Sequence, residues 1–324
     1  MSGLHVYAIP LRTRFRHIDM REGVLIRGPA GWGEFSPFRE YDVAEATSWW
    51  RAAREAADRG WPPAVRTRVG VNATVPAVSP EAVAGVLARF PGCTTAKVKV
   101  AAAGQSPAED EERLRAVRDE LGPGGRIRVD ANGAWDVEAA TGLLPRYDRA
   151  AGGLEYAEQP CRTIEELAAV RRKLDIPIAA DESIRRADDP LRVAEGQAAD
   201  IAVLKVQPLG GVRECLRIAE RIGLPVVVSS ALETSVGIAA GVALAAALPE
   251  LPYACGLATV SLLAHDVVDD PLVAVDGAIP VRRPVPSEAT LAAVRADEPT
   301  STWWTDRIAR VSQIAIVPGI AWGM

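Results

Sequence analysis

Three acidic residues at the ends of apolar runs could together hold a metal ion. Asp130 closes the run 126–130, Glu158 closes 153–158, and the run 177–181 ends with Asp181 followed by Glu182. Neighbours on a strand face opposite ways, so spacing leaves the choice between Asp181 and Glu182 open. Crowded carboxylates repel unless a cation neutralises them, and oxygen ligands without His or Cys favour Mg²⁺ or Mn²⁺. One such acid alone could equally be a helix N-cap, but three at matching positions favour a metal site.

Three lysines lie near the ends of the second and sixth runs, which would face each other across a ring of eight. Lys97 and Lys99 lie near the end of run 96–100, and Lys205 lies in run 200–206. The period of two lets Lys97 and Lys99 point to the same face. A single lysine at a strand end is more often a solvated surface charge, whereas an opposing Lys205 favours chemistry. A neutral lysine beside a metal suits the removal of a proton α to a carboxylate, because the metal stabilises the developing negative charge.

The elements that must position these groups are short β-branched runs separated by amphipathic helices. This alternation is typical of βαβ units and a parallel sheet. Eight runs in about 200 residues favour a closed (β/α)₈-type barrel over an open doubly wound sheet, and barrel sites lie at the C-terminal strand ends. The predicted runs are 68–72, 96–100, 126–130, 153–158, 177–181, 200–206, 225–229 and, most weakly, 253–257.

The regions before and after these eight runs show a different sequence pattern. Residues 1–65 contain extended segments, a Gly-rich turn at 31–33 and a helical pattern at 43–59 that Trp61-Pro62-Pro63 ends, which predicts a small α+β unit. After Asp276 the alternation stops, and the Trp-bearing end is expected to pack back on the N-terminal unit. The predicted domains are therefore a capping domain at 1–65, a catalytic barrel at 66–275 and a segment at 276–324 that completes the cap.

Composition excludes several classes of protein. The 324 residues are 48% apolar and 24% charged, with a formal net charge of -5, which predicts a globular protein and no nucleic-acid or membrane partner. Cys93, Cys161, Cys215 and Cys255 form no C-x-x-C pair, so a zinc or redox site is not expected. No signal peptide is visible, and the apolar stretch 234–249 predicts a buried helix, so a cytoplasmic location is expected. Monomer and homo-oligomer both fit the sequence.

The motifs together resemble the enolase superfamily. They are Lys97-x-Lys99, Asp130-Ala-Asn-Gly, Glu158-Gln-Pro, Asp181-Glu-Ser and Lys205, in this order. The resemblance covers the whole chain and implies a modified (β/α)7β barrel with a capping domain built from both termini. It also implies that Asp130, Glu158 and Asp181 are the Mg²⁺ ligands, with Mn²⁺ as a substitute. Because the seventh run carries no His, the chain is similar to the two-lysine, muconate-lactonising branch.

Within that branch the chain is most similar to the o-succinylbenzoate synthases. The similarity rests on residues 21–26, 31–38 and 229–237, and on the lack of an Asp-x-Asp motif at 254–259. It implies a hydro-lyase that performs the syn dehydration of 2-succinyl-6-hydroxy-2,4-cyclohexadiene-1-carboxylate toward menaquinone. Lys99 would remove the proton and then protonate the leaving hydroxyl, while Lys205 would stabilise the intermediate from the other face. Alternatives are an N-acylamino acid racemase with two lysine bases, and a non-catalytic barrel that binds a carboxylate.

Four further residues are candidates for substrate binding. Lys97 and Arg128 share the inward phase of Lys99 and Asp130 and could contact carboxylate oxygens, although structural ion pairs with the acids are equally compatible with their positions. Ser229 and Ser230 could hold the succinyl carboxylate or simply form a strand-to-helix turn. Residues 31–38 resemble a cap loop that closes over the site, whereas Trp135 and Cys161 are expected only to pack.

Overall fold

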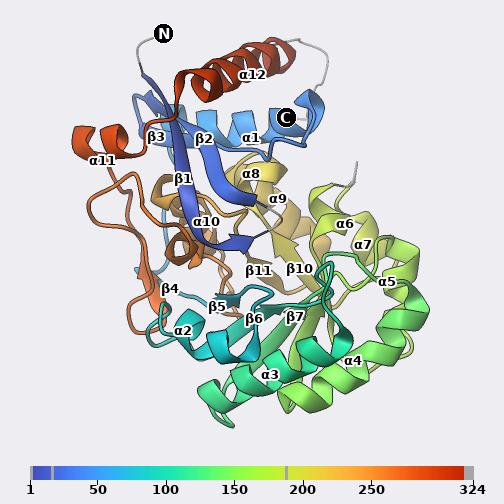
Figure 1. Cartoon of the computed structure of the whole chain (residues 1–324). Helices are drawn as coiled ribbons and strands as arrows, with labels where there is room; N and C mark the ends of the chain where they lie inside the picture. The colour runs from blue at the N-terminus through green and yellow to red at the C-terminus, as the bar shows by residue number, and fades with distance from the viewer. Residues whose placement is uncertain (1–2, 16–17, 187–188, 317–324) are drawn as a thin grey trace.

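The N-terminal part of the chain forms an antiparallel sheet covered by a helix. The structure is a computed structural model, described for residues 3–15, 18–186 and 189–316 (Figure 1). The strands β1 (Leu4–Phe15), β2 (Ile18–Gly28) and β3 (Gly31–Phe35) form one meander. Helix α1 (Val43–Arg54) begins at Asp42, whose side chain accepts from the backbone of Glu45, and continues into the π-helical turn η1 (Glu55–Arg59).

A parallel sheet of seven strands forms the body of the molecule. Its order is β11-β10-β9-β8-β7-β6-β5, so each strand lies beside its predecessor in sequence. The strands consist largely of small and β-branched residues buried on both faces, as expected for a sheet covered by helices. Their bounds are β5 (Ala73–Val75), β6 (Thr95–Lys99), β7 (Arg126–Asp130), β8 (Leu154–Glu158), β9 (Ile178–Ala180), β10 (Ile201–Leu204) and β11 (Val226–Val228).

Two isolated parallel bridges close this sheet into a ring. Cys255 pairs with Val71 just before β5, and Gly256 pairs with Ser229 just after β11. Backbone bonds from Asn72 N to Cys255 O (3.0 Å) and from Gly256 N to Val228 O (2.9 Å) join the two edges. The weakly predicted eighth run therefore lies at the eighth position of the ring, but as a two-residue seam and not as a strand. The predicted class, a modified barrel with an α+β cap, is confirmed.

The prediction of the first barrel strand, at residues 68–72, was wrong. Residues 68–72 do not form one barrel strand: β4 (Arg68–Gly70) pairs antiparallel with β12 (Ala278–Pro280), and the barrel strand β5 begins only at Ala73. In β4 only Val69 is buried, whereas all of β5 is buried. A strand with one wet face suits a two-stranded ribbon, while β5 lies in the covered sheet.

Helices surround the sheet, and several begin at side-chain caps. Ser106 and Thr163 each form a reciprocal capping box, with Glu109 and Glu166. Helix α10 is almost entirely buried, as predicted for 234–249, and within the described ranges no helix is long and apolar enough to cross a membrane. The helices are α2 (Val83–Leu87), α3 (Pro107–Leu121), α4 (Val137–Ala151), α5 (Ile164–Arg171), α6 (Glu182–Arg185), α7 (Arg192–Glu195), α8 (Val206–Leu209), α9 (Val212–Ile222) and α10 (Ser235–Ala247), with 3₁₀ turns η2 (Pro80–Ala82) and η3 (Thr259–Leu262).

The last described helices return to the N-terminal sheet. Helix α11 (Glu288–Ala293) precedes α12 (Glu298–Ile316), which lies along α1 at the top of Figure 1. Trp304 of α12 is buried against Phe35 in an edge-to-face contact, and both belong to one apolar cluster with Trp49 of α1. Residues 317–324 of the predicted C-terminal segment lie outside the described residues.

Candidate active site

The charged residues meet at the carboxyl ends of neighbouring strands. Asp130 and Glu158 are the last residues of β7 and β8 and are register partners of each other. Asp181 follows β9, and Lys205 follows β10. All four are buried. The parallel register, which aligns the strand ends, therefore brings the predicted acids and Lys205 to one rim of the ring.

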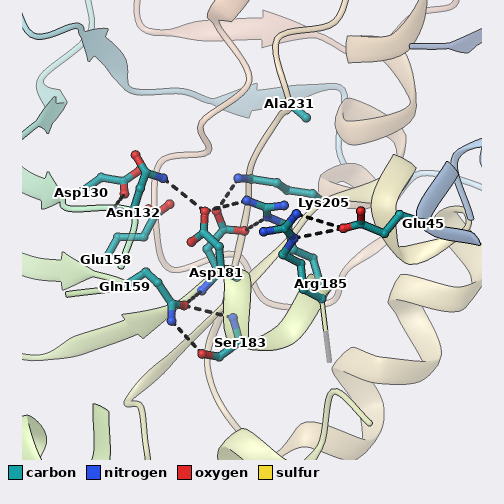
Figure 2. A network of polar contacts seen from close by, with 12 residues as sticks. Glu45, Asp130, Asn132, Glu158, Gln159, Asp181, Ser183, Arg185, Lys205 and Ala231 are labelled. Atoms are coloured by element: carbon teal, nitrogen blue, oxygen red, sulfur yellow. Dashed lines mark hydrogen bonds and ion pairs between the residues drawn. The ribbon is translucent and has the colours of Figure 1, made fainter. Parts of the chain in front are cut away.

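Ammonium groups lie between these carboxylates. Nζ of Lys97 lies 2.7 Å from Oε1 of Glu158 and 3.1 Å from Oδ2 of Asp130. Nζ of Lys99 lies 2.5 Å from the same Asp130 oxygen, while Lys205 donates to Oδ2 of Asp181. In Figure 2, Asp181 lies between Lys205 on one side and Asp130 and Glu158 on the other. The cluster alternates positive and negative groups, which lowers the cost of burying them.

Arg185 and Gln159 position Asp181 and Glu182, the two acids between which the sequence spacing could not choose a metal ligand. Arg185, from α6, places Nε 2.9 Å from Oδ1 of Asp181 and Nη2 2.6 Å from Oε1 of Glu182. Oε1 of Gln159 accepts from the backbone amides of Asp181 and Ser183 (Figure 2). Asp181 is fully buried, and Glu182 lies beside it at the edge of the cluster. Sequence reasoning missed Arg185, although its position four residues after Asp181 on a helix was a signal.

The pKa values reflect this crowding. Burial opposes ionisation, yet the Lys99 and Lys97 ammonium groups hold the pKa of Asp130 well below its usual range. Burial and the neighbouring Asp130 carboxylate raise the pKa of Glu158 to about 7. Burial, together with the Lys97 charge, lowers the pKa of Lys99. The site thus makes the Lys99 ammonium easier to deprotonate than that of an exposed lysine, and it disfavours ionisation of all the clustered acids at once.

The donor set fits a hard divalent cation. Asp130, Glu158 and Asp181 offer carboxylate oxygens only, as Mg²⁺ prefers. The raised pKa of Glu158 indicates that a further positive charge would be favourable here. Among the described residues, no group of three Asp, Glu, His or Cys side chains is arranged to hold a metal ion. In this arrangement Lys97, Lys99 and Lys205 form ion pairs with the three carboxylates.

A pocket opens above this cluster, and two different regions form its walls. Phe15 and Phe38 come from the N-terminal unit, and Leu232 comes from the loop after β11. Its remaining lining is mostly polar: Thr74, Lys97, Lys99, Asn132, Arg185, Lys205, Ser229, Ser230, Ala231, Gly256 and Thr259. Of the predicted cap loop 31–38 only Phe38 reaches the pocket. Asn132, which accepts from Lys99 at 2.8 Å, was missed although its motif was noted.

The predicted substrate-binding residues divide into two groups. Lys97, Ser229 and Ser230 line the pocket, and the Ser230 hydroxyl bonds to Gly256 O at 2.8 Å. Arg128 does not line it. The Arg128 guanidinium bonds to Glu155 (2.5 Å), Asn72 (3.1 Å) and Ala254 O (2.7 Å), and lies 4.6 Å from the centre of the Tyr156 ring. Its ion pair is thus with Glu155 and not with the clustered acids.

Trp135 and Cys161 occupy packing positions. They form an isolated parallel bridge, Cys161 is buried, and the Trp135 ring contacts Tyr147 with centroids 5.8 Å apart. The free Cys161 thiol has a pKa raised by burial, which makes it unreactive.

Comparison with known proteins assigns the fold to a class. Residues 81–286 match the family model described as enolase C-terminal domain-like, and residues 6–57 match the enolase N-terminal domain-like model. The muconate cycloisomerase of Pseudomonas fluorescens superposes with a TM-score of 0.73 at 21% identity, covering 91% of this chain and 98% of that one. An N-succinyl Arg/Lys racemase from Bacillus cereus superposes with a TM-score of 0.75 at 18% identity, covering 91% and 97%. These likenesses define the enolase-superfamily fold, and enzymes of this superfamily generally depend on a divalent metal ion.

Closer relatives define the family within that class. The o-succinylbenzoate synthase of Thermobifida fusca is 64% identical over 309 residues, which is 95% of each chain. That of Mycolicibacterium smegmatis is 58% identical over 95% of this chain and 94% of its own. The chain belongs to the o-succinylbenzoate synthase family of the enolase superfamily.

Proposed function

We propose that the protein dehydrates 2-succinyl-6-hydroxy-2,4-cyclohexadiene-1-carboxylate to o-succinylbenzoate, as a hydro-lyase in the cytoplasm on the route to menaquinone. The observation that carries this proposal is the distribution of lysines. Of the 37 Lys and Arg residues only four are lysines, and three of them, Lys97, Lys99 and Lys205, line the same pocket. Arginine does not lose its proton in proteins, so lysines are expected where an amine must titrate.

Mg²⁺ would be held by Asp130, Glu158 and Asp181, with Mn²⁺ as a possible substitute. When bound there it would stabilise negative charge on the substrate carboxylate. The oxygen-only donor set and the raised pKa of Glu158 support this assignment.

Lys99 is the proposed base and acid. Its neutral amine takes the ring proton α to the carboxylate, and the electrons of the broken C–H bond spread into the carboxylate. The resulting Lys99 ammonium then gives its proton to the hydroxyl group as the C–O bond breaks, so one water leaves and the ring becomes aromatic. The same group can serve both steps because a syn elimination presents the proton and the hydroxyl on one face. The lowered pKa of Lys99 supports the first step.

Lys205 is proposed to act from the opposite side of the pocket. Strands β6 and β10 are four positions apart in the ring, so Lys99 and Lys205 reach the pocket from opposite sides. The Lys205 ammonium would stabilise the negative charge of the planar intermediate. Lys97, Ser229 and Ser230 are proposed to contact substrate oxygens. Arg128, whose hydrogen bonds go to Glu155, Asn72 and Ala254, is proposed to support the strands from below instead.

An absorbance assay of o-succinylbenzoate formation tests the proposal. Purified protein with Mg²⁺ should form product, and thorough treatment with EDTA followed by gel filtration should abolish it until Mg²⁺ is returned. Absence of product with Mg²⁺ present would refute the proposed activity, and turnover unaffected by metal removal would refute the role of the acids.

A second activity is favoured by one feature, the presence of both Lys99 and Lys205 on opposite sides of the pocket. Two such amines could remove and return the α-proton of an N-succinylamino acid from either face, which would racemise it. Incorporation of solvent deuterium at the α-carbon of an N-succinylamino acid tests this. Exchange without racemisation would restrict the chemistry to one face.

A further inference from the structure

Arg21 lies behind both apolar walls of the pocket. It belongs to β2, is 2% exposed, and makes all of its hydrogen bonds to backbone carbonyls. Nε donates to Leu232 O at 2.8 Å, and Nη2 donates to Ser36 O and, at 3.4 Å, to Ala231 O. The guanidinium carbon lies 4.7 Å from the centre of the Phe38 ring. One buried cation thus contacts Phe38 directly and the backbone of Leu232.

The loop that Arg21 holds has a strained backbone. Leu232 adopts φ +68°, in the left-handed region that a branched side chain rarely occupies without support. On its two sides, both carboxylate oxygens of Glu233 accept from Ala231 N, and Thr234 begins α10. The pocket wall formed by Ser229 to Leu232 therefore depends on contacts that keep this turn in place.

Glu34 fixes the other end of the same loop. From β3, its 3%-exposed carboxylate accepts from Thr234 N (3.2 Å), from the Thr234 hydroxyl and from Gly237 N (3.0 Å). Tyr7 and Ser36 donate to Oε1 at 2.7 and 2.8 Å and hold the carboxylate in orientation. Both anchors belong to the N-terminal sheet, whereas the loop belongs to the barrel.

We propose that Arg21 and Glu34 are positioning residues that hold the loop 229–234, and with it Leu232 and Phe38, in the shape that receives the carbon skeleton of the substrate. This inference rests on the proposed function for its kinetic consequence. The N-terminal sheet would then contribute to substrate affinity. Proton transfer by Lys99 is expected to be unaffected, because Arg21 contacts none of the charged residues at the strand ends.

Hydrogen exchange tests the anchoring independently of activity. Arg21→Met should make the amides of 231–237 exchange at least about tenfold faster, since a left-handed non-glycine residue is disfavoured by roughly that factor. Arg27→Met is the matched control, because Arg27 lies on the same strand, is exposed and has its guanidinium over the Trp32 ring. Unchanged exchange in this segment for Arg21→Met would overturn the proposal. Arg21→Lys, which keeps the charge but cannot reach all carbonyls at once, serves if Arg21→Met does not fold.

Kinetics separate positioning from simple stability. In Arg21→Met, KM is expected to rise about tenfold and kcat to change less than about threefold, because the loss affects binding and not the proton-transfer groups. In a Leu232→Gly background the same substitution should change KM by less than about threefold, since glycine adopts φ > 0 without strain. Equal effects in both backgrounds, or a lowered Tm with unchanged KM, would show that Arg21 only stabilises the fold. A wild-type enzyme without dehydratase activity would refute the proposed function and leave the exchange test intact.

Discussion

Lys99 and Asp130 are register partners on β6 and β7, and Nζ of Lys99 lies 2.5 Å from Oδ2 of Asp130. The contact joins the proposed base to a proposed metal ligand through one pair of facing strand positions. A divalent cation at Asp130 would place positive charge beside Lys99 and further disfavour the ammonium form. Base strength and metal binding are therefore coupled by the sheet register.

Removal of the Lys99 amine should abolish turnover. Lys99→Ala is expected to lower kcat by at least about 10³-fold, because general acid–base catalysis by one group contributes factors of this size and Lys99 acts in both steps. Lys173→Ala is the matched control, since Lys173 is the exposed fourth lysine, just beyond α5. Full activity of Lys99→Ala in the absorbance assay would contradict the mechanism.

The pH dependence of kcat should follow the neutral form of Lys99. Burial lowers the pKa of this amine, so activity should fall as the pH drops through that pKa and level off above it. Measuring kcat from pH 6 to 10 in the wild type and in Lys205→Arg tests the assignment. The acidic limb should persist in Lys205→Arg, because Arg keeps the charge on which the role of Lys205 depends. A flat profile in the wild type would count against Lys99 as the base.

Thermal shifts can decide between Asp181 and Glu182 as metal ligand. Mg²⁺ at 100 times its Kd should stabilise the wild type by about 2.7 kcal/mol, because only the native state binds. Asp181→Asn should lose most of the resulting rise in Tm, whereas Glu182→Gln should keep it. A larger loss in Glu182→Gln would reverse the assignment. The readout needs no substrate and therefore separates metal binding from catalysis.

Glu233 should make stability depend on pH near neutrality. Burial and the adjacent Glu34 carboxylate raise the pKa of Glu233 to about 7. A raised pKa favours the protonated folded state, so this contribution is complete below the ordinary glutamate pKa and is lost as the pH rises through about 7. Urea unfolding of Glu233→Gln should show up to about 3 kcal/mol more stability relative to wild type at pH 8 than at pH 5. The exposed Glu220→Gln on α9 should show no such difference.

Two helical glycines should respond oppositely to alanine. Gly142→Ala in α4 meets no neighbour and should stabilise by about 0.5–1 kcal/mol through helix propensity. In α10, a Cβ at Gly237 would lie 2.5 Å from Cβ of Glu233 and 2.9 Å from Oε2 of Glu34. Gly237→Ala should therefore destabilise by about 1–3 kcal/mol, as overpacking does. A stabilised Gly237→Ala in thermal unfolding would contradict the close packing of Glu34 on this helix.

The residues of the rim could be predicted because their positions follow from strand periodicity. Once the chain is read as parallel strands, the register brings Lys99, Asp130 and Glu158 together without further information. Arg128 shows the limit of this reasoning. Its side chain shares their inward phase but lies one layer lower in the barrel, where its guanidinium forms an ion pair with Glu155.

The walls of the pocket could not be predicted in the same way. Phe15, Phe38 and Arg21 reach it through the packing of the cap on the barrel, and no local pattern encodes that contact. The error at run 68–72 has the same cause, because its first residues pair with β12, a distant segment of the chain. Long-range pairing, and not local propensity, decided both outcomes.

The cluster that joins Trp304 to Phe35 and Trp49 imposes an order on folding. Its members come from the chain before and after the barrel, so it closes a loop that contains every strand of the ring. While that loop is a random coil, closing it carries a high entropic cost, and a folded barrel removes most of that cost by bringing its ends together. We expect slow, late acquisition of Trp304 burial in refolding. A newly folded barrel would pass through a state in which the cap does not yet cover the carboxyl ends of its strands. Chaperones and proteases would act on the chain in that state.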